Sequence, residues 1–296
     1  MSSVGPRLPP LEGEGRTWTP DPHPSAQANK FRHVTPPVFN RYVALGDSTT
    51  EGLMDVHPDG KSFRGWADRL AEQLAAVNPD LLYANLAIRG RKLPQIRAEQ
   101  LQPALALKPD LASVLGGVND ILRREVDLDA RADDLESIVR SLRESGATVL
   151  MVNYPDIGAS VTIGASRFRP RLQGFNRTIR EIAERQGAVL VDLERDGIVH
   201  PALWSTDRLH ASAIGHERIA AVAAAALEVN ELDPSWEGAL PEHRIRPRPV
   251  RIAGDVVWMG RYLAPWVMRR LRGTSSGDGI EPKRPSLEPI QRADQA

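Results

Sequence analysis

The sequence of 296 residues contains no cysteine. This absence excludes disulfide bonds and metal sites built on thiolates. There is no excess charge of either sign, because lysine plus arginine and aspartate plus glutamate each number 38. The net charge of the chain therefore gives no electrostatic attraction to polyanions, and nucleic acid is not expected as a partner. Nor does any stretch approach the run of about 18–20 apolar residues that a membrane-spanning helix needs.

Signals for export and for bound metals are missing as well. Residues 1–10 lack a basic stretch followed by a long apolar one, so no secretory signal peptide is expected. The absence of cysteine is compatible with the cytoplasm, so a cytoplasmic protein that could also attach to the membrane periphery is expected. Histidines and carboxylates do not gather at the spacing of metal ligands, apart from Asp207 and His210. Gly116-Gly117 is too short for a phosphate-binding loop, so neither a metal nor a cofactor is expected.

Hydrophobic patterning predicts an α/β fold between residues 39 and 232. Five short apolar runs, expected as strands, alternate there with five helical patterns. The expected strands are 42–45, 81–86, 111–115, 148–153 and 189–192, and the expected helices are 65–77, 93–106, 130–144, 174–186 and 213–228. This alternation predicts a five-stranded parallel sheet with helices on both faces. Residues 1–38 are rich in proline, glycine, serine and charge, and are expected to be a disordered or loosely packed arm.

Small polar clusters follow the first three predicted strands. Gly46-Asp47-Ser48 ends the first strand, Gly90 follows the second, and Gly117-Val118-Asn119-Asp120 follows the third. Open α/β sheets bind their ligands in a crevice outside the carboxyl ends of the strands. Asp207 and His210 precede the last predicted helix of this region, from where they can reach the same crevice.

A serine, a histidine and an aspartate are the parts of an activated nucleophile. In this interpretation His210 takes the proton of the Ser48 hydroxyl, while Asp207 fixes the orientation and tautomer of the imidazole. The N–H groups of Ser48 and Gly90 and the Asn119 amide could stabilise an oxyanion. Simpler roles are also open, because Ser48, Asn119 and Asp207 could cap helices or turns and Gly90 could serve a turn with positive φ.

In this order the clusters resemble the SGNH subgroup of GDSL esterases and lipases, which is named for serine, glycine, asparagine and histidine. The resemblance covers about residues 42–227. The residues it assigns to the site are Ser48, Gly90, Asn119 and His210, with Asp207 as the triad acid. One departure is Thr49, because the family's name has leucine at that position, and this change would alter the edge of the pocket.

The resemblance also implies a fold and a reaction. The fold would be a flavodoxin-like three-layer α/β/α sandwich over residues 39–232. The reaction would be hydrolysis of a small-molecule carboxylic ester or thioester through an acyl-enzyme, without a cofactor. Acyl-lipids, acyl-CoA and acetylated small molecules all remain candidate substrates, because the sequence does not choose among them.

Further polar residues surround the predicted crevice. Asp47 and Asp120 are expected to brace the loops through hydrogen bonds. Arg89 and Arg91 are either solvated charges or contacts for a phosphate or carboxylate on the substrate. Phe168 lies in the segment 155–170, which is either a plain connector or a substrate-binding rim. Of the other histidines, His216 is expected at the surface, and His57 and His200 have no evident partner.

Beyond residue 232 the composition changes. The extension 233–272 is rich in arginine and tryptophan. Its residues from Arg244 to Arg272 include eight arginines and only one acid, Asp255, so this segment has a net charge of +7. The pattern of apolar and basic side chains over residues 252–272 predicts an amphipathic basic helix, with an interruption near Pro265. The helix would either cover an apolar patch of the hydrolase domain or make a peripheral contact with an anionic membrane through residues 244–272. The polar tail 273–296 is expected to be disordered.

A second class of function fits the same sequence less well. The chain could be a binding or scaffold protein that uses an SGNH-like domain without turnover and is docked by its basic extension. A chain released from catalysis has no reason to keep all five site residues, which favours the enzyme. A fluorophosphonate probe, which reacts with an activated serine, separates the two hypotheses.

Overall fold

The computed structural model describes residues 36–57, 60, 62–155, 165–194, 200–230, 240 and 248–290. Most of the predicted N-terminal arm, up to residue 35, lies outside the described residues, as do residues 156–164 of the segment considered as a rim or connector. Among the described residues, no helix combines the length and the apolar composition needed to cross a bilayer.

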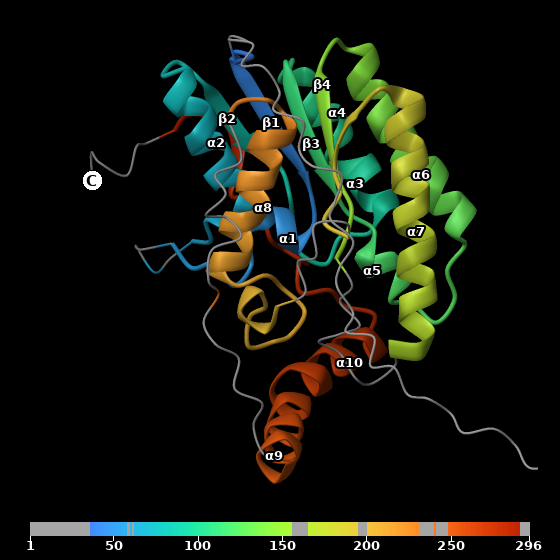
Figure 1. Cartoon of the computed structure of the whole chain (residues 1–296). Helices are drawn as coiled ribbons and strands as arrows, with labels where there is room; N and C mark the ends of the chain where they lie inside the picture. Colours follow the sequence, from blue (N-terminus) through green and yellow to red (C-terminus); the bar gives the residue numbers. More distant parts are fainter. Residues whose placement is uncertain are drawn as a thin grey trace, which may run out of the picture. The chain divides into compact units, whose positions relative to one another are not determined.

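The fold is built around a mixed sheet with the strand order β5-β4-β3-β1-β2-β6 in the described part of the chain, whose four central strands are labelled in Figure 1. The strands are β1 (Arg41–Gly46), β2 (Leu82–Asn85), β3 (Leu111–Leu115), β4 (Thr148–Val152), β5 (Val189–Val191) and β6 (Arg284–Pro289). The first five are parallel, and they are the five strands expected from the apolar runs. Residues 42–45 of β1 are fully buried, as a parallel strand covered by helices on both faces requires.

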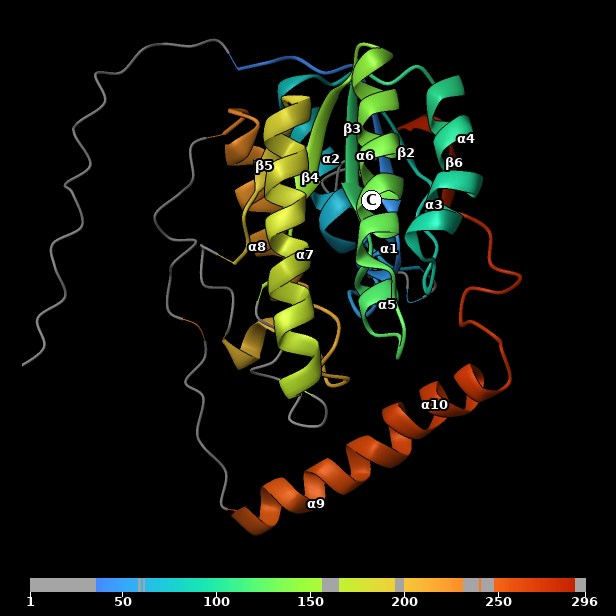
Figure 2. The ribbon, with the colours of Figure 1, turned by 90° about the vertical axis from the view of Figure 1, so that its right-hand side faces the viewer.

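Helices cover both faces of the sheet (Figure 2). On one face α2 (Gly65–Val77) packs against α8 (Ala213–Ala226). On the other face α3 (Leu93–Glu99) and α7 (Ala165–Gln186) each pack against α6 (Leu128–Glu144). The remaining helices of this part are α1 (Ser48–Glu51), α4 (Leu101–Ala106), α5 (Val118–Ile121) and the short η2 (Pro201–Leu203). The three-layer α/β/α fold expected from the sequence is confirmed.

Local sequence explains where several helices begin and end. The Asp127 side chain accepts a hydrogen bond from the Ala130 N–H at the start of α6, and Ser212 caps α8 in the same way. The helix expected over 93–106 is divided at Gln100 into α3 and α4. Pro103 lacks the N–H that would continue the ladder of α3, which accounts for the break.

Strand β6 differs from the expectation of a disordered tail over 273–296. It pairs antiparallel with β2 and closes that edge of the sheet. Lys283 anchors it, because its Nζ lies 2.8 Å from the carbonyl oxygens of Phe63 and Arg64 and from the Asp68 carboxylate. The prolines within β6 are tolerated because an edge strand can spare N–H groups.

Residues 248–271 of the C-terminal extension form a helical rod, after which the chain returns to the sheet (Figure 2). It consists of α9 (Arg248–Trp258), the π-helical segment η4 (Met259–Leu263) and α10 (Ala264–Leu271). A helix was expected over 252–272, with an interruption near Pro265. The proline ring would clash with the carbonyl group of Arg261, four residues earlier, so a widened π turn just before Pro265 is the physical form of that interruption.

Candidate active site

The turn after β1 places Ser48 at the carboxyl edge of the sheet. Gly46 has φ of 155°, and a Cβ atom there would lie 2.3 Å from the carbonyl oxygen of Leu115, so only glycine fits. Asp47 caps α1 by accepting a hydrogen bond from the Thr49 N–H at 3.2 Å. Ser48 is therefore the first residue of a helix, and its side chain is largely buried.

Ser48, His210 and Asp207 form a continuous hydrogen-bonded chain. The His210 Nε2 lies 2.8 Å from the Ser48 Oγ, and the His210 Nδ1 lies 2.5 Å from the Asp207 Oδ2. Burial opposes ionisation of Asp207, but the hydrogen bonds donated by His210 and Ser205 hold the pKa of its carboxyl well below its usual range. The carboxylate therefore stays ionised at neutral pH and keeps accepting the hydrogen bond from the imidazole Nδ1–H.

A tight loop sets the spacing of the acid and the histidine. The Ser205 N–H donates to the His210 carbonyl oxygen, and a bridge joins Trp204 to Ala211. Arg208 takes a left-handed conformation with φ of 59°, which turns the chain between Asp207 and His210. The loop therefore directs the two side chains of an i, i+3 pair toward each other.

Of the predicted oxyanion donors besides Ser48, Gly90 lies in the turn after β2 and Asn119 lies on the short helix α5 after β3. Gly90 has φ of 76°, and its N–H donates no hydrogen bond within the part of the chain that the structure describes. The Asn119 Nδ2 donates at 3.1 Å both to the Asp47 Oδ2 and to the Arg91 carbonyl oxygen. The Asn119 amide must therefore redirect one of its two N–H bonds before it can donate to an oxyanion.

Asp47 and Asp120 both lie buried behind these loops. Burial, above all other causes, raises the pKa of Asp47 to about 7, although its hydrogen bonds from Thr49 and Asn119 act in the opposite direction. Burial likewise raises the pKa of Asp120, whose Oδ2 accepts from the Leu93 N–H at 3.0 Å. Through these contacts Asp47 is linked to Asn119, and Asp120 is linked to the start of α3.

The three residues considered for substrate contact have partners within the protein. Arg89 forms an ion pair with Glu51, whose side chain is 6% exposed. Arg91 lies 2.7 Å from Glu99. Phe168 packs against the hydrophobic core. Each of the two guanidinium groups is thus already paired with a carboxylate. These pairs do not support the predicted contact of Arg89 or Arg91 with an anionic group of the substrate.

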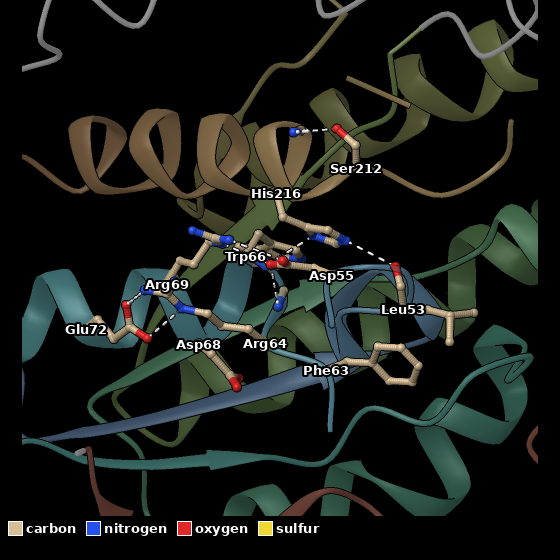
Figure 3. A network of polar contacts seen from close by, with 12 residues as sticks. Leu53, Asp55, Phe63, Arg64, Trp66, Asp68, Arg69, Glu72, Ser212 and His216 are labelled. Carbon is tan, nitrogen blue, oxygen red and sulfur yellow. Dashed lines mark hydrogen bonds and ion pairs between the residues drawn. The ribbon is translucent and has the colours of Figure 1, made fainter. Parts of the chain in front are cut away.

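His216 corrects a prediction, because it is fully buried and not at the surface (Figure 3). Its Nδ1 accepts a hydrogen bond from the Trp66 N–H at 3.1 Å, and its Nε2 lies 3.3 Å from the Leu53 carbonyl oxygen. Burial is the main cause that lowers the pKa of the imidazole to about 4. The signal in the sequence was its spacing from the apolar Ile219 and Ala220, which lie on the same buried face of α8.

The other histidines of the described residues have partners within the protein or lie at its surface. His200 also has a partner that the sequence did not indicate, because its Nδ1 accepts from the Ala202 N–H and caps η2. Among the described residues, no three side chains of histidine, aspartate or glutamate gather as a metal ion would require.

A doubly wound sheet with a serine, a histidine and an aspartate linked at its carboxyl edge is the arrangement of a hydrolase with an activated serine. Residues 44–218, more than half of the chain, match the GDSL-like Lipase/Acylhydrolase family. The chain belongs to this family, and it is a carboxylic ester hydrolase of the SGNH type.

Known proteins with similar sequences and structures agree with this assignment. The acetylxylan esterase of Geobacillus stearothermophilus is 25% identical over 193 residues, which cover 58% of this chain and 86% of that protein. A crystal structure of a catalytic mutant of Axe2, an acetylxylan esterase from the same organism, matches with 22% identity and a TM-score of 0.54, over 64% of this chain and 94% of that one. An α/β hydrolase enzyme from the metagenome of Lake Arreo in Spain matches with 24% identity and a TM-score of 0.55, over 66% and 96%. The two structural matches show the fold alone.

Proposed function

We propose that the protein hydrolyses carboxylic esters through an acyl-enzyme formed on Ser48. The observation that carries this proposal is the 2.8 Å contact between the Ser48 Oγ and the His210 Nε2, with Asp207 behind the imidazole. As the Ser48 oxygen bonds to the ester carbonyl carbon, His210 takes the hydroxyl proton and then passes it to the leaving alcohol. A water molecule, activated by the same imidazole, then releases the acid and restores Ser48.

The negative oxygen of the tetrahedral intermediate needs donors that are in place before the reaction. The N–H groups of Ser48 and Gly90 are the backbone candidates, and the Asn119 amide is the side-chain candidate. Asn119 would break its bond to the Arg91 carbonyl oxygen and keep the one to Asp47, because Asp47 itself lies next to the nucleophile. One such donor typically contributes a factor of about 10²–10³ to the rate.

An acetyl ester of a small molecule is the first candidate substrate. It is supported by the similarity to acetylxylan esterase, although at 25% identity this remains a proposal. A second candidate is an ester with a longer acyl chain, such as an acyl-lipid. It is supported by the exposed apolar side chains of α9 and α10, among them Val257 and Leu271, which are 66% and 76% exposed.

Hydrolysis of a series of p-nitrophenyl esters, from acetyl to long acyl chains, tests both the reaction and the substrate class. Ser48→Ala and His210→Ala should each lower kcat by about a thousandfold or more, because the two side chains act as one unit. Ser141→Ala on α6 and His57→Asn at the surface serve as matched controls and should retain wild-type rates. Near-wild-type turnover by Ser48→Ala or His210→Ala refutes the assignment, and a folded wild-type protein without any turnover favours the scaffold hypothesis.

A further inference from the structure

One face of the C-terminal helical rod packs against the loop that carries Asp207 and His210. The Trp258 Nε1 donates a hydrogen bond to the Asp207 carbonyl oxygen at 2.8 Å. Arg208, the next residue of the loop, pairs with Asp255 of α9 at 2.6 Å, and its guanidinium lies 5.3 Å from the centre of the Trp258 ring. This face of the rod is therefore fixed to the active site.

Another face of the rod is apolar and exposed. Five of the nine large hydrophobic side chains that are exposed in the described part of the chain lie on α9 and α10. They are Val256, Val257, Val267, Met268 and Leu271. The exposed small residues Ala253, Gly260 and Ala264 continue the same spacing of three or four residues, so that an apolar stripe runs along the rod. Soluble proteins rarely leave such a contiguous patch in water without a partner.

Positive charge accompanies this apolar stripe. Arg261, Arg269 and Arg272 are exposed on the same rod. The segment between Arg244 and Arg272 carries a net charge of +7 in a chain that is neutral overall. Asp255, its one acid, is already paired with Arg208. An apolar stripe accompanied by arginines is complementary to a bilayer whose headgroups are negative, because the stripe enters the acyl boundary while the guanidinium groups stay at the phosphates.

The chain that follows the rod reaches the other side of the active site. Gly277 is buried against the loop that carries Gly90, and a Cβ atom on Gly277 would lie 2.0 Å from the Arg89 carbonyl oxygen. A Cβ atom on Gly90 would lie 2.3 Å from the Ser275 Oγ. The rod is thus tied through Asp255 and Trp258 to the loop of Asp207, and the chain just beyond it is packed against the loop of Gly90.

We propose that the apolar stripe of residues 253–271 docks the protein on an anionic lipid bilayer and holds its active site next to the membrane surface. The docking does not depend on turnover, so it can be tested separately from the esterase reaction. Deleting the extension is not a suitable test, because strand β6 and the anchored Lys283 lie beyond the rod and would be lost with it. Single-site variants on the exposed face leave these anchors in place.

The test is co-sedimentation of the full-length protein with vesicles of phosphatidylcholine, with and without phosphatidylglycerol, at low and at physiological salt. We expect binding to the anionic vesicles that weakens with salt. Exchanging both Arg269 and Arg272 for glutamate should weaken this binding by roughly 25-fold or more, because each arginine contributes about a factor of five. Val257→Ser and Leu271→Ser should each weaken it as well, since they remove apolar surface from the stripe.

Two exposed residues outside the rod give matched controls. Arg140→Glu on α6 and Val38→Ser before β1 should bind as the wild type does. All variants should hydrolyse a water-soluble ester at the wild-type rate, which shows that the fold is intact. The proposal is overturned if the full chain ignores anionic vesicles at low salt, or if the control variants lose binding to the same extent. It is also overturned if Leu271→Ser converts a dimer to a monomer, because the stripe would then be an interface between two copies.

Discussion

His216 gives a sharp prediction about stability and pH. Its imidazole is held neutral in the folded protein, with the pKa lowered from 6.5 to about 4. The unfolded chain takes up a proton on this residue below about pH 6.5, whereas the folded protein does so only near pH 4. Acidification through this window therefore favours the unfolded state, and stability that is present at neutral pH is lost.

The magnitude follows from the two pKa values. At about 1.4 kcal/mol for each pH unit, the full difference corresponds to about 3 kcal/mol of unfolding free energy. Between pH 7 and pH 5 the loss should be about 2 kcal/mol. His216→Asn removes the titration but keeps an acceptor near the position of Nδ1 for the Trp66 N–H. The variant should be less stable than the wild type at pH 7. Between pH 7 and pH 5, however, it should not lose the unfolding free energy that the wild type loses through His216.

Chemical denaturation at pH 7 and pH 5 measures the effect. Comparing the two proteins at both pH values cancels the contributions of other groups, among them Asp47, whose raised pKa acts in the opposite direction. His57→Asn makes the same substitution at an exposed histidine and serves as the matched control. If His216→Asn loses as much stability on acidification as the wild type, the buried neutral imidazole is not the cause and the reasoning fails.

Three further predictions concern the site and its anchors. Asp207→Asn should lower kcat by roughly 10²–10⁴-fold with little change in KM, measured by steady-state kinetics, because the imidazole loses its charged partner; an unchanged kcat would contradict this. Trp258→Phe keeps an aromatic ring but loses the hydrogen bond to the Asp207 carbonyl oxygen, so kcat should fall several-fold while KM and the thermal midpoint stay near wild type. Lys283→Met leaves the Asp68 carboxylate without its cation and should cost about 3 kcal/mol in denaturant unfolding, whereas Lys108→Met should cost little.

Local patterns were sufficient for most of the fold. The five apolar runs became the five parallel strands, because buried strands need residues that are apolar on both faces. The order of Ser48, Asp207 and His210 along the chain pointed to one crevice, and the structure brings the three side chains into hydrogen-bonding contact. Both inferences depend on neighbours in sequence or on the regular geometry of a parallel sheet.

Long-range partners account for what the sequence did not indicate. The sequence of β6 is typical of a polar, proline-rich tail. The strand is held in place because Lys283 donates to the carbonyl oxygens of Phe63 and Arg64, more than 200 positions earlier. The spacing of His216 from Ile219 and Ala220 marks the buried face of α8, but the Trp66 N–H that donates to it lies 150 positions earlier in the chain. Asn119 was expected to donate to an oxyanion, but its amide already donates to Asp47 and to the Arg91 carbonyl oxygen, which are distant from it in sequence.

The most direct test of the central claim is to trap the nucleophile. The full-length protein is treated with a fluorophosphonate, and the intact mass and the modified peptide are determined. If Ser48 is the activated nucleophile, the protein forms a single adduct on Ser48, Ser48→Ala forms none, and His210→Ala reacts much more slowly, since the serine is then not activated. Labelling that persists unchanged in Ser48→Ala, or ester hydrolysis by a wild-type protein that the probe never modifies, would contradict this assignment.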